Sequence, residues 1–271
     1  FIEFTGKNSE TIKRLRNLTK NAVSTLSEFP ISWALDRSKY KEVLYKGYES
    51  GQKPSEVSGL PRLFYDRNTP FEKTIKIFNY YSEKTVVQKP NAYIIPQGWW
   101  KVTDLLKLNK VKMEPLKKDT VIEVEVYKID DYKTLPRQYE MHHLNSDVKV
   151  SSSIKKISFR KGDWFIPMNQ PANRFLIETL EPHGEDSYFA WNYFDAVLGQ
   201  KEGYSAYAFE DIAAEHLKNN PELKAKLQQR IATDTAFAKN GRAQLNFVYQ
   251  NSRWFEPAHM VYPVYRVVKG Q

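Results

Sequence analysis

The chain has 271 residues, of which 41% are hydrophobic and 14% aromatic, enough to bury a sizeable core in one large domain or two modest ones. Its net charge is +9, but acidic residues are interspersed among the basic ones, and no Arg-rich helix, zinc finger or aromatic RNA-binding signature accompanies them, so the sequence predicts no nucleic-acid partner. The absence of cysteine excludes disulfides, thiolate zinc sites and cysteine nucleophiles, and no apolar run approaches the ~20 residues that a membrane span needs.

The start of the chain is predicted to be an amphipathic helix. Apolar residues recur at three- and four-residue spacing from Ile12 onward, while basic residues take much of the opposite face. Asn8 or Ser9 is suited to cap the first turn, and Pro30 to end the helix. We therefore expect residues 1–29 to form one helical connector.

Residues 30–170 are predicted to be rich in strands. One segment, residues 120–129, alternates apolar residues with Glu123 and Glu125, as a half-buried strand does. The three serines at residues 151–153 are interpreted as a hairpin loop. The expected strands are residues 31–35, 42–48, 71–78, 85–95, 120–129, 148–150, 156–160 and 164–167, and residues 99–108 are expected to form a short helix.

After Pro171 the spacing of apolar residues becomes helical. Pro221 follows two asparagines, which is a typical helix start, and Asp186 or Ser187 is suited to cap a helix that begins there. Helices are expected at residues 171–180, 187–198, 209–217, 221–231 and 235–249, followed by a strand at residues 261–268.

This order of elements predicts an α+β fold. Strands come first and helices later, which is not the alternation of a βαβ sheet. Residues 30–271 would form one α+β domain, mainly antiparallel and β-rich over residues 30–170, and helical over residues 171–251. We expect the final strand at residues 261–268 to rejoin the earlier sheet, giving interleaved layers rather than two separable cores.

Several segments are distinctive at the level of a protein family. Residues 90–99 read Pro-Asn-Ala-Tyr-Ile-Ile-Pro-Gln-Gly-Trp, and residues 162–182 and 186–192 combine a strand that ends at a proline with a Pro-started helix and an aromatic segment. Further matching blocks lie at residues 209–215, 236–240 and 262–266. Together they resemble the region downstream of the catalytic domain in bacterial zinc carboxypeptidase-like proteins, metallopeptidases of the carboxypeptidase A type, over nearly all of the chain.

The resemblance implies a parent enzyme whose zinc-binding part is not in this chain. Zinc carboxypeptidases hold their metal with a His-x-x-Glu pair and a distant His, and a Glu activates the bound water. None of the five histidines here is followed by Glu three residues later. We therefore expect no cofactor and no catalytic or metal-binding residue in this chain, with zinc only in the absent catalytic domain of the parent.

On this resemblance the chain is a non-catalytic accessory region. It would pack against its own upstream metallopeptidase domain, stabilise it and shape or cover its substrate cleft, with a peptide substrate as a further partner. Residues 1–29 would connect the two. The resemblance also implies a bacterial protein that is exported to the periplasm or outside the cell. Because the chain starts at Phe1, without an initiator Met or a signal peptide, we expect a processed form or an excised fragment.

Two other classes of function remain open from the residues alone. One is a free-standing module that binds peptide or glycan in an exposed aromatic groove. The other is an independent hydrolase that uses the acidic residues between 178 and 186, which would require those carboxylates to converge in a deep pocket. An apolar face left uncovered on the N-terminal helix would favour the accessory region over both.

Arg174 and Trp100 are candidate ligand-binding residues. Arg174, near the start of a helix, could receive the C-terminal carboxylate of a peptide, although an i,i+4 pair with Glu178 is the simpler interpretation. Trp100 follows Trp99, and the pair could form a stacking platform. Because adjacent helical residues diverge by ~100°, we expect Trp99 in the core and Trp100 partly exposed.

Glu181 and Asp186 are the other two candidates. Both belong to the densest acidic cluster of the chain, between residues 178 and 186, which also contains His183. Paired carboxylates could perform general acid–base chemistry. For Asp186, capping of the following helix is the more economical interpretation.

Overall fold

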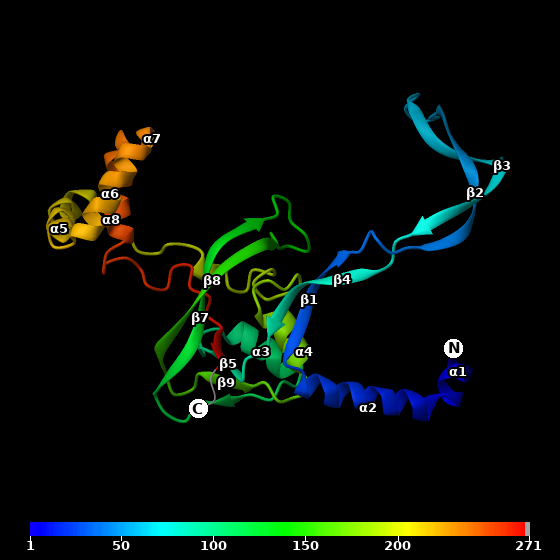
Figure 1. Ribbon diagram of the computed structural model, residues 1–271, viewed down its shortest axis with the longest axis horizontal. Helices are drawn as coiled ribbons and strands as arrows, with labels where there is room; N and C mark the ends of the chain where they lie inside the picture. Colours follow the sequence, from blue (N-terminus) through cyan, green and yellow to red (C-terminus); the bar gives the residue numbers. More distant parts are fainter. Residues whose placement is uncertain (269–271) are drawn as a thin grey trace. The chain divides into compact units, whose positions relative to one another are not determined.

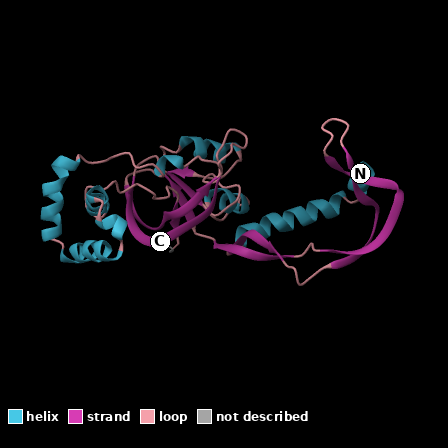
Figure 2. Ribbon diagram, turned by 90° about the horizontal axis from the view of Figure 1, so that it is seen from above, coloured by secondary structure: helices cyan, strands magenta, loops and turns pink. Residues whose placement is uncertain are grey.

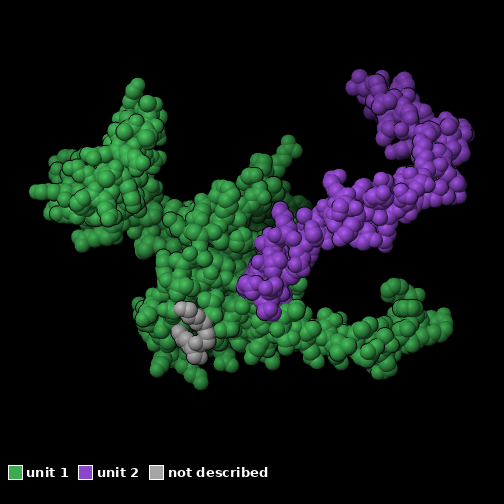
Figure 3. Space-filling view, viewed as in Figure 1, with its two compact units in different colours: residues 1–26, 89–271 green, residues 27–88 purple. Residues whose placement is uncertain are grey.

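The computed structural model describes residues 1–268, and the chain folds as an α+β protein. It divides into two compact units, residues 27–88 and residues 1–26 with the chain from Lys89 onward (Figure 3). This division does not coincide with the predicted connector of residues 1–29 and single domain of residues 30–271. It follows from strand pairing, because β1 (Glu28–Leu35) pairs with β4 (Tyr81–Gln88) and closes residues 27–88 into a unit.

Residues 27–88 consist of two antiparallel ribbons. Besides β1 with β4, the long strand β2 (Lys41–Pro54) pairs with β3 (Pro61–Ile77), seen in blue and cyan in Figure 1. The predicted strands at residues 31–35 and 42–48 are confirmed inside β1 and β2, and the one at residues 71–78 is confirmed as far as Ile77, where β3 ends. β2 and β3 stay paired as far as Pro54 and Pro61. In the turn between them, Ser55 N donates a hydrogen bond to Leu60 O at 2.8 Å.

The larger unit is built on a six-stranded antiparallel sheet. Its order is β6 (Glu114–Pro115), β9 (Trp164–Pro167), β5 (Ala92–Ile95), β10 (Tyr265–Val267), β7 (Thr120–Thr134) and β8 (Asn145–Phe159). The expected return of the last strand is confirmed, since Tyr265 pairs with Ile94 and Arg266 with Glu125. Its apolar core comprises Ala92, Ile94, Ile122, Val124, Val126, Phe159 and Val267.

Two strand predictions are wrong. The segment 85–95 is not one strand but parts of β4 and β5, which belong to different units; the interruption contains Pro90, which lacks a backbone N–H for a ladder. The serines at residues 151–153 are not a loop. They lie in the middle of β8, paired with residues 126–128 of β7, and their side chains are exposed, so small polar residues fit this edge strand.

The larger unit also contains two helices, α3 (Trp100–Leu108) and α4 (Asn173–Leu180), and a 3-10 turn, η1 (Asp195–Val197). The predicted helix at residues 187–198 is wrong. Asn192 has a φ of 66°, which interrupts a right-handed helix. Aromatic packing holds this segment instead, with Phe189 and Phe194 edge-on to Tyr262 at ring-centroid distances of 6.0 and 5.1 Å.

The C-terminal helices lie together (Figure 2) and share a small apolar core of their own. They are α5 (Ala206–Lys218), α6 (Pro221–Thr233), α7 (Thr235–Ala238) and α8 (Gly241–Gln250). The helix predicted at residues 235–249 is divided between α7 and α8, because Asn240 adopts a non-helical conformation and its Oδ1 accepts from Ala243 N at 3.0 Å. The shared apolar residues are Phe209, Ala213, Leu227, Phe237, Leu245, Val248 and Tyr249.

The N-terminal helix comes in two pieces, α1 (Ile2–Lys7) and α2 (Ser9–Thr25). Asn8 does not cap α2 with its side chain, because its Nδ2 donates to Phe4 O at 2.9 Å and closes α1. The helix ends at Thr25 rather than at residue 29, since the chain enters β1 at Glu28. No residue of α1 or α2 is buried.

Candidate functional site

Helix α2 carries an apolar face that the described residues leave uncovered. Ile12, Leu15 and Leu18 expose 42%, 52% and 55% of their surface, and Ala22 is exposed as well. These four residues recur at spacings of three and four and therefore share one side of the helix. We call them the N-terminal apolar face. Much of the remaining surface of the helix is basic, with Lys13, Arg14, Arg16 and Lys20.

The body of the larger unit contacts α2 at its last turn. Nδ2 of Asn173, at the start of α4, lies 3.3 Å from both Val23 O and Ser24 O, and Lys89 Nζ donates to Ser24 O at 3.1 Å. Val23 and Ser24 are half-buried, whereas residues 10–22 are all exposed. The helix is thus anchored at its C-terminal end and presents its preceding turns to solvent.

The structure brings Arg174 to Glu178, as the simpler interpretation predicts. Nη1 of Arg174 lies 2.9 Å from Oε1 of Glu178, one turn later on α4. Trp100 is 60% exposed at the first position of α3. Trp99 is half-buried and packs edge-on against Phe194 with ring centroids 5.1 Å apart. The two tryptophans therefore do not share a stacking surface.

The acidic cluster does not converge on one pocket. Asp186 is exposed, and its Oδ1 accepts from Nε1 of Trp191 at 3.2 Å. Its predicted role as a helix cap is wrong, because turns take the place of the helix. Glu181 lies in the core, and only 1% of its surface is exposed. The carboxylates of Glu178, Glu181 and Asp186 thus lie in three separate environments.

Glu181 belongs to a buried polar network that the sequence interpretation missed. Tyr93 O–H donates to its Oε1 at 2.5 Å, and Nε of Arg266 lies 3.0 Å from the same oxygen. Nη1 of Arg266 donates to the hydroxyl of Tyr127 at 2.6 Å and also pairs with Glu125. The network joins the residue that follows α4 to β5, β7 and β10. A signal for it exists in the sequence, because an arginine inside a short apolar strand requires buried partners.

The environment fixes the protonation of these groups. Burial raises the pKa of Glu181, and the Arg266 guanidinium and the Tyr93 hydroxyl oppose that shift. Burial also raises the pKa of Tyr93 and of Tyr127, so both phenols keep their protons and donate. The pKa of His183 is lowered by burial and by Arg266. The network is consistent with a structural role, because the Glu181 carboxyl and the Arg266 guanidinium are almost closed off from solvent and Glu125 is half-buried.

Comparison with protein-family models, curated proteins and solved structures found no match. Function is therefore inferred from the residues of the chain itself. Within residues 1–268 there is no group of three or more His, Asp or Glu side chains arranged to hold a metal ion. Over the same residues, every helix is too short or too polar to cross a bilayer.

Proposed function

We propose that this chain is a non-catalytic accessory region of a zinc carboxypeptidase-like protein, which stabilises the metallopeptidase domain upstream of it or shapes that domain's substrate cleft. The observation that carries the proposal is the N-terminal apolar face. It lies on a helix whose last turn alone is held by the body of the unit, and its leucines and isoleucine are about half exposed. Such a face is typical of a helix that docks on a partner.

The upstream domain is the partner that this arrangement favours. On this proposal the catalytic domain precedes Phe1 in the same polypeptide, so the apolar face lies next to the point of attachment. Covalent linkage gives a high effective concentration, and a small contact area then suffices for docking. Complete burial of a Leu or Ile side chain contributes ~1.5–3 kcal/mol relative to full exposure, and the half-exposed side chains here would gain part of that. The basic side of α2 would remain in water.

The resemblance of residues 90–99, 162–182 and 186–192 to the downstream region of these metallopeptidases supports the same parent. Zinc and the catalytic residues would belong to the upstream domain. Such a parent would be a bacterial protein that is exported to the periplasm or outside the cell. The solvent-closed network around Glu181 fits a region that supplies structure rather than chemistry.

The test is co-expression of this chain with the upstream part of its own open reading frame as two separate polypeptides. We expect them to co-purify and to elute together in size-exclusion chromatography. The double variant Leu15→Glu, Leu18→Glu should lose the complex, because two carboxylates then face the apolar partner. The matched control is Asn17→Glu, Asn21→Glu, which adds the same charges to the opposite side of α2 and should retain it.

Thermal unfolding of each isolated variant shows whether it is folded. Two separately soluble polypeptides that do not associate would contradict the proposal. So would an upstream region without a His-x-x-Glu pair and a later His.

A further inference from the structure

The ribbon formed by β2 and β3 (Figure 1) contains no core. None of residues 32–86 is buried, and the exposed side chains of the ribbon include Leu44, Tyr45, Leu63 and Tyr65. A two-stranded ribbon on its own is only marginally stable in water, and further strands are what usually stabilise it. A partner that adds strands to one edge of this ribbon would therefore stabilise it.

The two edges of the ribbon differ. β3 contains Pro61 and Pro70, and its residues 67–69 bulge out of the pairing with β2. Prolines and bulges discourage the pairing of an edge strand with another chain. β2 has no proline between residues 41 and 53, and within residues 1–268 no strand pairs with its outer edge. The edge of β2 is therefore the one that is open to another strand.

The side chains of β2 alternate between the two faces of the ribbon. Lys46 lies on one face, where its Nζ is 2.5 Å from Oε1 of Glu72 on β3. Glu42 lies on the same face, opposite Lys76 of β3. Nζ of Lys76 is instead 4.1 Å from the ring centroid of Tyr40, so Glu42 has no ion-pair partner among residues 1–268.

A second copy of β2 complements this pattern. Two copies related by a two-fold axis perpendicular to the sheet pair antiparallel, and residues equally far from the axis lie opposite each other on the same face. With the axis at Leu44, Glu42 of each copy lies opposite Lys46 of the other. On the other face, Val43 of each copy lies opposite Tyr45 of the other. Opposite charges and aromatic–β-branched pairs both stabilise neighbouring strands.

The same register continues the charge pattern onto β3. Lys76 flanks Glu42, and Glu72 flanks Lys46. Across the four strands each outer row thus alternates in sign, with a lysine and a glutamate from either copy. An axis at Lys46 would instead place lysine opposite lysine, and like charges directly opposite each other are destabilising. The charges of β2 therefore favour the register centred on Leu44.

We propose that the edge of β2 pairs with the edge of β2 in a second copy of this chain, antiparallel and centred on Leu44. The two ribbons then form one four-stranded sheet, with a β2 strand from each copy in the middle. Main-chain hydrogen bonds supply the attraction, and the side-chain rows set the register. The proposal does not rest on the proposed function, because α2 takes no part in it.

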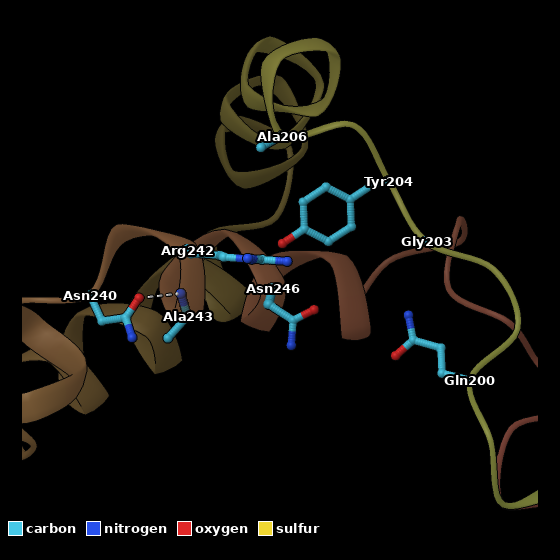
Figure 4. Close-up of a pocket in the computed structure, with 8 residues that line it drawn as sticks. All are labelled: Gln200, Gly203, Tyr204, Ala206, Asn240, Arg242, Ala243 and Asn246. Carbon is cyan, nitrogen blue, oxygen red and sulfur yellow. Dashed lines mark hydrogen bonds between the residues drawn. The ribbon is translucent and has the colours of Figure 1, made fainter.

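A polar groove of about 610 Å³ in the helical segment, between residues 200–206 and the beginning of α8, shows no such complementarity to a partner (Figure 4). The charges of Arg242 and Glu210 act on the pKa of Tyr204 in opposite directions. No single ligand charge is therefore selected there, whereas the charges of β2 match a second copy of the same strand.

Sedimentation equilibrium of the full chain tests the association. We expect a species of twice the monomer mass of 31.8 kDa at concentrations up to ~100 µM, since a small interface is weak. Leu44→Lys should weaken the dimer about tenfold or more, because two lysines then meet at the axis. The matched control is Thr74→Lys, which adds the same charge to the same face on β3, one strand away from the edge, and should retain the dimer.

Introduced thiols test the register, because the chain has no cysteine of its own. Residues directly opposite each other have Cβ atoms ~4.5–5.5 Å apart, near the separation that a disulfide spans. Leu44→Cys should therefore form a disulfide between two copies in mild oxidant. Val57→Cys is the control, because Val57 is 99% exposed in the turn between β2 and β3, outside the paired segment, and should cross-link far more slowly.

A chain that stays monomeric at the same concentrations would overturn the proposal. So would a Leu44→Lys variant that dimerises like the wild type, or a Val57→Cys variant that cross-links as fast as Leu44→Cys. Loss of the dimer in the variant Leu15→Glu, Leu18→Glu would mean that the copies associate through α2, and would also overturn it. Failure of the upstream domain to bind α2 leaves the β2 dimer intact, so the two proposals fail separately.

Discussion

Glu181 is a carboxyl group held inside the core by two opposing influences. Burial favours its neutral form, while the Arg266 guanidinium and the Tyr93 hydroxyl favour the carboxylate. Burial is the larger influence, and the pKa of Glu181 is raised. Removal of one partner of such a pair costs ~3–5 kcal/mol because a charge is left buried, so the pair matters to stability even where its net contribution is small.

This direction gives a prediction for the pH dependence of stability. Between its ordinary pKa of 4.5 and its raised pKa in the folded chain, Glu181 binds a proton when folded and releases it on unfolding. Its stabilising contribution is therefore complete below pH 4.5 and is lost as pH rises through the folded pKa. The difference in free energy of unfolding, wild type minus Glu181→Gln, should fall with pH in that window, by up to ~1.4 kcal/mol per unit.

Urea unfolding at a series of pH values measures this difference. The exposed neighbour Glu185 provides the control, and Glu185→Gln should not reproduce the fall. A difference that grows as pH rises toward 4.5 and is level above it would mean that Arg266 outweighs burial and that the pKa is lowered instead.

The residues that sequence reasoning located correctly depend on local geometry. The Arg174–Glu178 pair follows from helical spacing, and Trp100 is exposed as predicted. Trp99, expected in the core on the same helix, is instead half-buried and precedes α3. The partners of Glu181 come from β5, β7 and β10, and no spacing in the sequence brings those strands together. The network could therefore be predicted to exist from the arginine in β10, but its members could not be named.

At the level of elements, boundaries that depend on local sequence were predicted correctly, and boundaries that depend on contacts between distant segments were not. Helices α5 and α6 were predictable because apolar spacing and Pro221 act within one segment. The length of β8 is set by its pairing with β7. Because of this pairing, three exposed serines lie in the middle of the strand instead of in a loop. The segment before η1 has helical spacing but is held by aromatic contacts to distant Tyr262, which override that preference.

The turn after α4 gives a prediction at this scale. Gly184 N donates to Glu181 O at 3.0 Å, and a Cβ at Gly184 would lie 2.4 Å from the carbonyl oxygen of Glu178. Because backbone atoms cannot move aside cheaply, Gly184→Ala should lower the free energy of unfolding by ~1–3 kcal/mol, as overpacking does. Gly199→Ala is the control, since no atom lies within 4 Å of the added methyl group. Chemical denaturation compares the two, and equal midpoints would contradict the steric argument.

On the scale of the whole molecule, residues 27–88 interrupt the larger unit in sequence. The chain leaves that unit after residue 26 and returns to it at Lys89. Composition does not mark either junction, because both lie in segments of ordinary polar and apolar residues. The α+β class was predictable from the order of strands and helices, but the insertion depends on the pairing of β1 with β4, residues separated by up to 60 positions.

The position of α1 and α2 in the larger unit leads to the last prediction. Because none of residues 10–22 is buried and the anchoring contacts involve Val23 and Ser24, a chain that lacks residues 1–20 should unfold at the same urea concentration as the full chain. It should also bind less of the dye ANS, which reports exposed apolar surface. Tryptophan fluorescence can follow both proteins, since the first tryptophan is Trp33.

A full-length variant with Leu15→Ser and Leu18→Ser separates the loss of apolar surface from the loss of the helix itself. It should match the truncated chain in dye binding and the wild type in unfolding midpoint. A lower midpoint for the truncated chain would mean that α1 and α2 stabilise their own unit. The N-terminal apolar face would then be part of this chain's own packing, and the case for an upstream partner would lose the observation on which it rests.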